Sequence, residues 1–78
     1  MAGLFGWDVL ARAEVTRRIA HGDRYLVTRL FLADGRVMQQ TNPGMPDLED
    51  RWHEVGRFRE LDSALRKLRR EGWSVTER

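Results

Sequence analysis

The sequence contains no cysteine, and this absence removes several kinds of chemistry at once. Without thiols there can be no disulfide framework, no thiolate metal site and no cysteine nucleophile. Long apolar runs are missing too, because every uninterrupted apolar stretch extends over only a few residues. We therefore expect neither a membrane span nor the apolar core of a signal peptide, and we expect a cytoplasmic protein.

Side chains that could carry catalysis or hold a metal are also scarce. The two serines do not sit in a G-x-S-x-G elbow, and the two histidines, His21 and His53, are too far apart to form a zinc signature. The one acidic cluster, between positions 47 and 54, lacks the D-x-D-x-D-G order of a calcium loop. The sequence therefore predicts no enzymatic activity, no cofactor and no metal site.

The 78 residues that are present, 41% of them hydrophobic and 33% charged, are typical of one small globular domain spanning 1–78. A chain of this length buries about 60 to 65% of the surface that its unfolded form exposes. A single core of that size stabilises the fold by only about 3 to 5 kcal/mol. Association with a partner, or with a second copy, would add stability.

The charge composition favours binding proteins without choosing among them. Fourteen basic residues against twelve acidic ones leave a net charge of +2, and Lys67 is the only lysine among the basic residues. This net positive charge is lower than is usual for a protein that binds nucleic acid. The planar guanidinium group of arginine suits protein interfaces and phosphates alike.

The first half of the chain has the two-residue period of an antiparallel sheet. Residues 9–20 alternate, with Val9 and Ala11 on the same face, and residues 25–33 form the strongest predicted strand. Asp34-Gly35 is a hairpin signal that leads into a return strand over 36–41. These patterns predict a β-meander over 9–41, preceded by an apolar N-terminal arm over 1–8.

The second half is less regular until its final helix. Prolines and glycine predict a loop over 42–50, and the segment 51–58 fits either a strand or a short helix, of which we favour the strand. An apolar stripe at helical spacing predicts a helix over 60–71. Gly72 is placed to end that helix in a Schellman motif, with Trp73 packed against Leu68, and residues 73–76 can add a short last strand.

These elements predict an α+β domain. We expect an antiparallel β-meander of three to four strands, with one C-terminal α-helix packed on one face. The strand at 25–33 is apolar on both faces, with Leu30 and Leu32 on one side and Tyr25 and Phe31 on the other. One helix covers one face, so either the arm and the loop over 42–50 cover the second face, or another molecule does.

An uncovered second face would make this chain a binding module. Tyrosine, tryptophan and arginine are the residues that dominate hot spots of protein interfaces. We therefore expect a protein partner or a homodimer, with the chain acting as a small adaptor or inhibitor of a larger complex. Its size and lack of catalytic groups suit proteins of phages and other mobile elements. The candidate partner-binding residues are Tyr25, Arg29, Phe31, Trp52, Arg12 and Arg18.

The alternative partner is single-stranded DNA or RNA. Tyr25 and Phe31 would then stack on bases while arginines of the sheet contact phosphates. The basic face of the final helix is a second candidate surface for phosphates, although a solvated helix has the same pattern. Its residues are Arg66, Lys67, Arg69 and Arg70.

Overall fold

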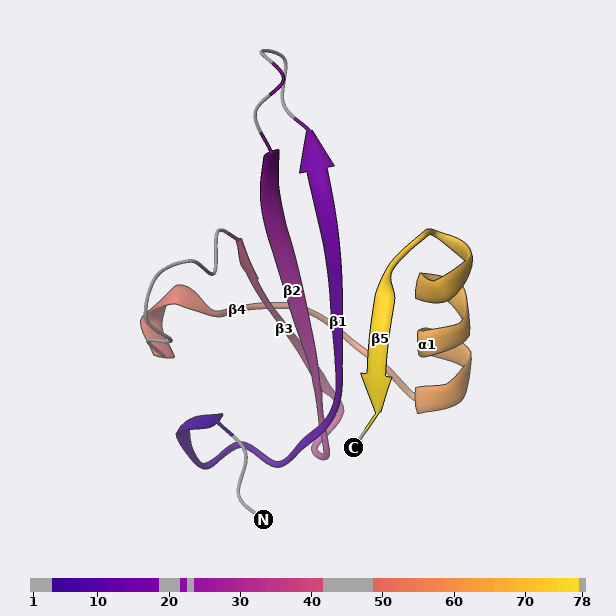
Figure 1. The fold of residues 1–78 in the computed structure, drawn as a ribbon. Helices are drawn as coiled ribbons and strands as arrows, with labels where there is room; N and C mark the ends of the chain where they lie inside the picture. The colour runs from indigo at the N-terminus through magenta and orange to yellow at the C-terminus, as the bar shows by residue number, and fades with distance from the viewer. Residues whose placement is uncertain (1–3, 19–21, 23, 42–48, 78) are drawn as a thin grey trace.

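The computed structural model describes residues 4–18, 22, 24–41 and 49–77. Within these residues one antiparallel sheet forms, with the strand order β4-β3-β2-β1-β5, and one α-helix packs on it (Figure 1). The elements in chain order are η1 (Leu4–Gly6), β1 (Val9–Arg18), β2 (Arg24–Leu32), β3 (Arg36–Thr41), η2 (Glu49–Arg51), β4 (His53–Arg57), α1 (Leu61–Arg70) and β5 (Ser74–Glu77).

The α+β class, the antiparallel sheet and the α-helix are confirmed, but the sheet has five strands rather than three to four. The ambiguous segment forms the edge strand β4, and the last residues form the full strand β5. β5 pairs with β1, placing Val75 opposite Ala13, so α1 carries the chain from one edge of the sheet to the other. A strand of only four residues gains its hydrogen bonds from β1, and its own pattern cannot show that pairing.

The β2–β3 hairpin turns at the predicted position. Gly35 has φ +96°, a left-handed conformation that glycine adopts without steric cost, and its amide donates to the Leu32 carbonyl at 2.9 Å. The backbone amide of Arg36 donates to Asp34 Oδ1 at 3.0 Å, which closes the turn. Between β1 and β2 only Gly22 is described, and positions 42–48 of the expected loop lie outside the described residues.

A β-bulge in β1 changes which face Val9 occupies. Val9 is opposite Leu32, but Ala11, two residues later, is opposite Phe31, which is only one residue earlier in β2. The extra residue reverses the alternation, as bulges do. Val9 therefore packs on the opposite face of the sheet from Ala11 and Ala13, whereas the sequence pattern placed all three on one face.

The end of α1 has the predicted Schellman geometry. Gly72 has φ +94°, and its amide donates to the Arg69 carbonyl at 3.2 Å. The Trp73 amide donates to the Leu68 carbonyl at 3.0 Å, which is the second bond of the motif. Trp73 is buried in the same core cluster as Leu68, so the motif directs the chain from α1 back into β5.

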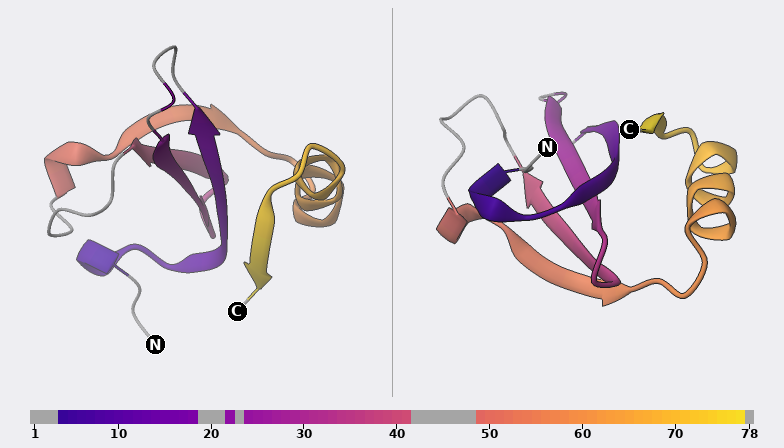
Figure 2. Two further views of the ribbon diagram at one scale, coloured as in Figure 1. Left: turned by 45° about the horizontal axis from the view of Figure 1, so that its top comes forward. Right: turned by 90° about the horizontal axis from the view of Figure 1, so that it is seen from below.

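Each face of the sheet carries a hydrophobic core. We call the core beneath α1 the helix-side core and the core on the opposite face the arm-side core. Figure 2 shows η1 and η2 on one side of the sheet and α1 on the other. The helix-side core contains Ala11, Ala13, Val27, Phe31, Val37, Leu65, Leu68 and Trp73. The arm-side core contains Leu30, Leu32, Met38 and Trp52, with Trp7 and Val9 packed against it.

The N-terminal arm therefore covers part of the second face. Trp7 packs against the arm-side core, and its ring lies edge to face with Trp52 at 6.3 Å between centroids. Phe5 makes a similar contact with Trp7 at 5.2 Å on the outer side. Of the two alternatives for the second face, the structure supports cover from within the chain.

Candidate functional site

The aromatic residues predicted to form a binding surface lie mostly inside the molecule. Phe31 is 3% exposed in the helix-side core, with its ring 5.5 Å from that of Phe58. Trp52 is 5% exposed in the arm-side core. Tyr25 is half-buried against the helix-side core. These rings therefore expose little of their surface, because Phe31 and Tyr25 pack in or against the helix-side core and Trp52 packs with Trp7 in the arm-side core.

The three predicted arginines of the sheet are spread over β1 and β2. Arg12 lies 3.4 Å from Glu14 on β1, and Arg18 is exposed at the end of the same strand. The guanidinium carbon of Arg29 lies 4.6 Å from the Trp73 ring centroid, and its Nε donates to Gln39 Oε1 at 2.8 Å. Arg29 lines a groove between α1 and the sheet, and Arg12 lines a separate, smaller pocket with Thr76 and Glu77.

The basic residues of α1 also separate. Arg66 and Arg70 are exposed, and Arg69 is paired with Glu77 of β5 at 3.0 Å. Lys67 lines the same groove as Arg29. The structure therefore brings Lys67, from the basic face of the helix, together with Arg29 and Phe31 from the predicted partner-binding set.

This groove has a volume of about 460 Å³ and lies between α1 and the β2–β4 part of the sheet. α1 lies beside β5, at the edge of the sheet opposite to β4 (Figure 1). It packs over the small side chains of Ala11 and Ala13. The helix consequently leaves β3 and β4 only partly covered. The groove is lined by buried or half-buried residues, namely Arg29, Phe31, Val37, Phe58, Ala64 and Leu68, and by the exposed residues Val55, Gly56, Arg57, Lys67 and Glu71.

The charged rim of the groove is cationic. Arg29, Arg57 and Lys67 face a single lining carboxylate, that of Glu71. Burial lowers the pKa of the Arg29 guanidinium from its ordinary value; the Glu71 carboxylate opposes this effect and the nearby Arg17 adds to it. Arg29 stays protonated at neutral pH, because arginine does not lose its proton in proteins. The rim therefore holds a partly desolvated positive charge that an anionic group would stabilise.

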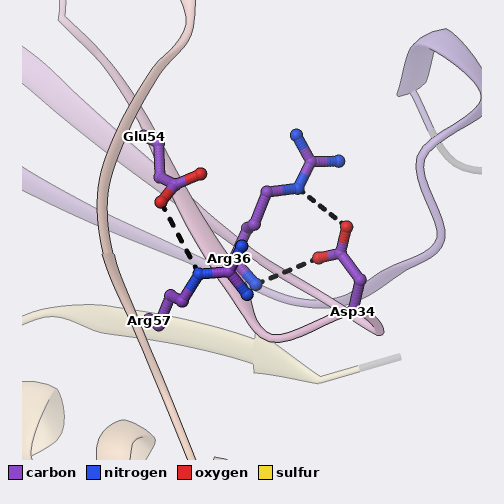
Figure 3. Close-up of polar contacts among 4 residues, drawn as sticks. All are labelled: Asp34, Arg36, Glu54 and Arg57. Atoms are coloured by element: carbon purple, nitrogen blue, oxygen red, sulfur yellow. Dashed lines mark hydrogen bonds and ion pairs between the residues drawn. The ribbon is translucent and has the colours of Figure 1, made fainter.

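A second cluster of charges lies beside the rim and leaves Arg57 available. The Nε of Arg57 is 3.8 Å from Glu54 Oε2, and both side chains are exposed, so this ion pair contributes little to the stability of the fold. The neighbouring Arg36 Nε donates to Asp34 Oδ2 at 2.7 Å, as Figure 3 shows. Asp34 is thus engaged mainly with Arg36, and Arg57 has a long surface pair with Glu54 and a weaker charge interaction with Asp34.

The β4 side of the groove is an open strand edge. Within the described residues β4 pairs with β3 alone, at the end of the sheet order, and all five of its residues are exposed. Val55 is 47% exposed, and the register shift between Val37 and Met38 places it in a bulge. A Cβ added at Gly56 would meet no atom within 4 Å. The groove is therefore accessible along the backbone of β4.

The lining of this groove suits an anionic group together with an apolar side chain. Its titratable lining residues are cations and one glutamate, which suit anionic groups, and its floor suits apolar side chains. Among the residues that the structure describes, no three His, Cys, Asp or Glu side chains gather as a metal site would require. In the same residues no helix has the length and apolar character needed to cross a membrane.

Sequence reasoning missed four of the exposed lining residues: Val55, Gly56, Arg57 and Glu71. They come from two elements on either side of the groove, and their proximity follows from the path of the chain from β4 into α1. The one signal in the sequence was the glycine at 56, inside a segment that also fits a strand. Comparisons of the chain with protein-family models, with curated proteins and with solved structures find no match.

Proposed function

We propose that this chain is a non-enzymatic protein-binding module, an adaptor or inhibitor that holds a segment of a partner protein in the groove between α1 and β4. The observation that carries the proposal is the combination, in one groove, of an apolar floor, a cationic rim and an open strand edge. Peptide segments supply all three complementary features: apolar side chains, carboxylates and backbone hydrogen-bonding groups.

The aromatic rings favour a protein partner over single-stranded nucleic acid. Binding of unpaired bases depends on open aromatic faces for stacking. Arg29 lies over the Trp73 ring at 4.6 Å and Arg17 lies over it at 5.8 Å. Phe31 is 3% exposed, so its ring offers no free face to a base. The groove is therefore better suited to aliphatic side chains and carboxylates than to bases.

Site-specific photo-crosslinking in the source cell tests this proposal. A benzophenone amino acid at Val55 places the reactive group at the groove, and the same amino acid at Asp62, an exposed position of α1 that does not line the groove, is the control. We expect a discrete protein adduct from position 55 that is absent from position 62. Lys67→Glu should reduce the adduct, and Arg66→Glu, an equal charge change outside the groove, should leave it unchanged.

A test of oligonucleotide binding could contradict the proposed function. Fluorescence anisotropy with labelled single-stranded DNA and RNA should show no binding at about 0.15 M salt. Micromolar affinity that falls steeply as salt rises would overturn the protein-binding proposal, because such a slope reports contacts to phosphates. Adducts from position 55 that nuclease removes would overturn it as well.

A further inference from the structure

Gly56 is a glycine that the fold of β4 does not require. Its φ lies outside the left-handed range, so an L residue could adopt the same backbone conformation, and a Cβ added there would meet no atom within 4 Å. Gly35 is the contrast, because its φ of +96° needs glycine. A glycine inside a strand weakens the strand, and where the backbone does not need it, it marks a place where another chain approaches closely.

The charges around Gly56 indicate the chemistry of that other chain. Arg57 is the next residue of β4, and Lys67 lines the groove from α1. Arg29 adds a third cation to the lining, against the single carboxylate of Glu71. A basic segment would be repelled by this rim, and an acidic segment would be attracted to it.

The edge position of β4 indicates the shape of the bound segment. An extended peptide can lie along an edge strand and add its backbone to the sheet, with alternate side chains directed to the two sides. One set of side chains would enter the groove beside Val37 and Leu68, which are 7% and 4% exposed. The absence of a side chain at Gly56 leaves the room for that approach.

We propose that the groove binds an acidic, extended segment of the partner protein, which passes over Gly56 with its carboxylates against Arg57 and Lys67 and an apolar side chain on the floor. This inference rests on the proposed function, and it names the class of segment that the module recognises. The segment would alternate Asp or Glu with aliphatic residues.

Because Lys67 is the only lysine, its amine can report the position of a bound carboxylate. Carbodiimide condenses a carboxylate with a primary amine into an amide with loss of water. The probe is an acetylated heptapeptide in which Glu alternates with Leu. We expect a peptide adduct on Lys67, located by tandem mass spectrometry, which also separates it from any adduct on the terminal amine. Lys67→Arg should abolish that adduct and change the affinity for the peptide less than twofold.

Affinity measurements with matched variants test the location of the peptide. In fluorescence anisotropy at about 0.15 M salt, Gly56→Leu and Lys67→Glu should each weaken peptide binding about tenfold. Arg66→Glu makes the same charge change as Lys67→Glu, but on the outer face of α1. It should weaken peptide binding less than twofold, because salt screens charges beyond about 8 Å. Thermal melts of Gly56→Leu should show a folded protein, since its side chain enters open space.

Three results would overturn the inference. The first is equal binding of a peptide with Lys in place of each Glu, and the second is equal loss of affinity in Lys67→Glu and Arg66→Glu. The third is no peptide binding while the crosslink from position 55 to a protein persists, in which case the proposed function stands and the acidic segment is wrong. Absence of both peptide binding and that crosslink would reject the proposed function too.

Discussion

At the residue scale, the surroundings decide what one residue type does. Gly35 lies in the β2–β3 hairpin and Gly56 in the edge strand β4. The left-handed backbone conformation at position 35 requires a glycine, whereas the backbone at position 56 does not. Arginines differ in the same way. Arg36 closes a turn with Asp34, whereas Arg29 is half-buried on the ring of Trp73 and faces the groove. Composition alone could not separate these roles.

The turn at Asp34 has a measurable pH signature. Hydrogen bonds from the Arg36 backbone amide, and then from its side chain, lower the pKa of Asp34. Because the pKa is lower in the folded state, the stabilisation is fully present above the unfolded-state pKa and is lost as the pH falls through the folded-state pKa. We expect Arg36→Ala to raise the pKa of Asp34 in a ¹³C NMR titration of its carboxyl carbon. An unchanged pKa would contradict the assigned contact.

At the element scale, patterns located strands and helix but not the way they pack. The strand over 25–33 was recognised as apolar on both faces, and the structure confirms two cores on its two sides. Tyr25 and Phe31 were expected on a binding surface and lie against α1 instead. Which face of a two-sided apolar strand meets the helix depends on the path of the chain after β4, and local periodicity does not contain that path.

The burial of Phe31 predicts a large loss of stability on truncation. Phe31→Ala should lower the free energy of unfolding by about 3 to 5 kcal/mol in urea denaturation, because it removes a buried ring and its edge contact with Phe58. Val55→Ala, at a 47% exposed position, is the control and should change it by less than about 0.5 kcal/mol. Intact stability of Phe31→Ala together with loss of partner binding would restore the aromatic surface that the sequence suggested.

At the scale of the whole molecule, a short chain builds two small cores on one sheet. α1 covers the helix-side core, and the N-terminal arm contributes Trp7 to the arm-side core. Among the described residues, neither cover fills the β4 side of the helix face, and the groove lies there. A domain with this little buried surface gains stability from a partner that fills such a groove.

The covering role of the arm predicts the effect of removing Trp7. Trp7→Ala should expose part of the arm-side core and end the ring contact with Trp52. We expect the free energy of unfolding to fall by about 2 kcal/mol, which corresponds to a drop in Tm of roughly 10 °C for a domain of this size. Phe5→Ala, at the more exposed outer ring, should lower Tm less in the same circular dichroism melts. Equal melting of Trp7→Ala and the wild type would show that the arm does not cover the core.

The sequence by itself determined the local elements. Asp34-Gly35 set the hairpin, the Leu65 and Leu68 stripe set α1, and Gly72 with Trp73 set its end, because turns, helix faces and caps depend on neighbours within a few residues. The same local information limited the functional prediction, since it identified Arg29 and Lys67 as separate candidates without bringing them together.

Tertiary structure alone decided the pairing of β5 with β1, the reversal at the bulge of β1 and the cover of both sheet faces. It also decided the groove, whose residues come from β2, β3, β4, α1 and the segments next to them. The physical reason is that these features depend on contacts between segments far apart in the chain, which form only when the sheet and the helix pack together. No periodicity within one segment encodes such a contact.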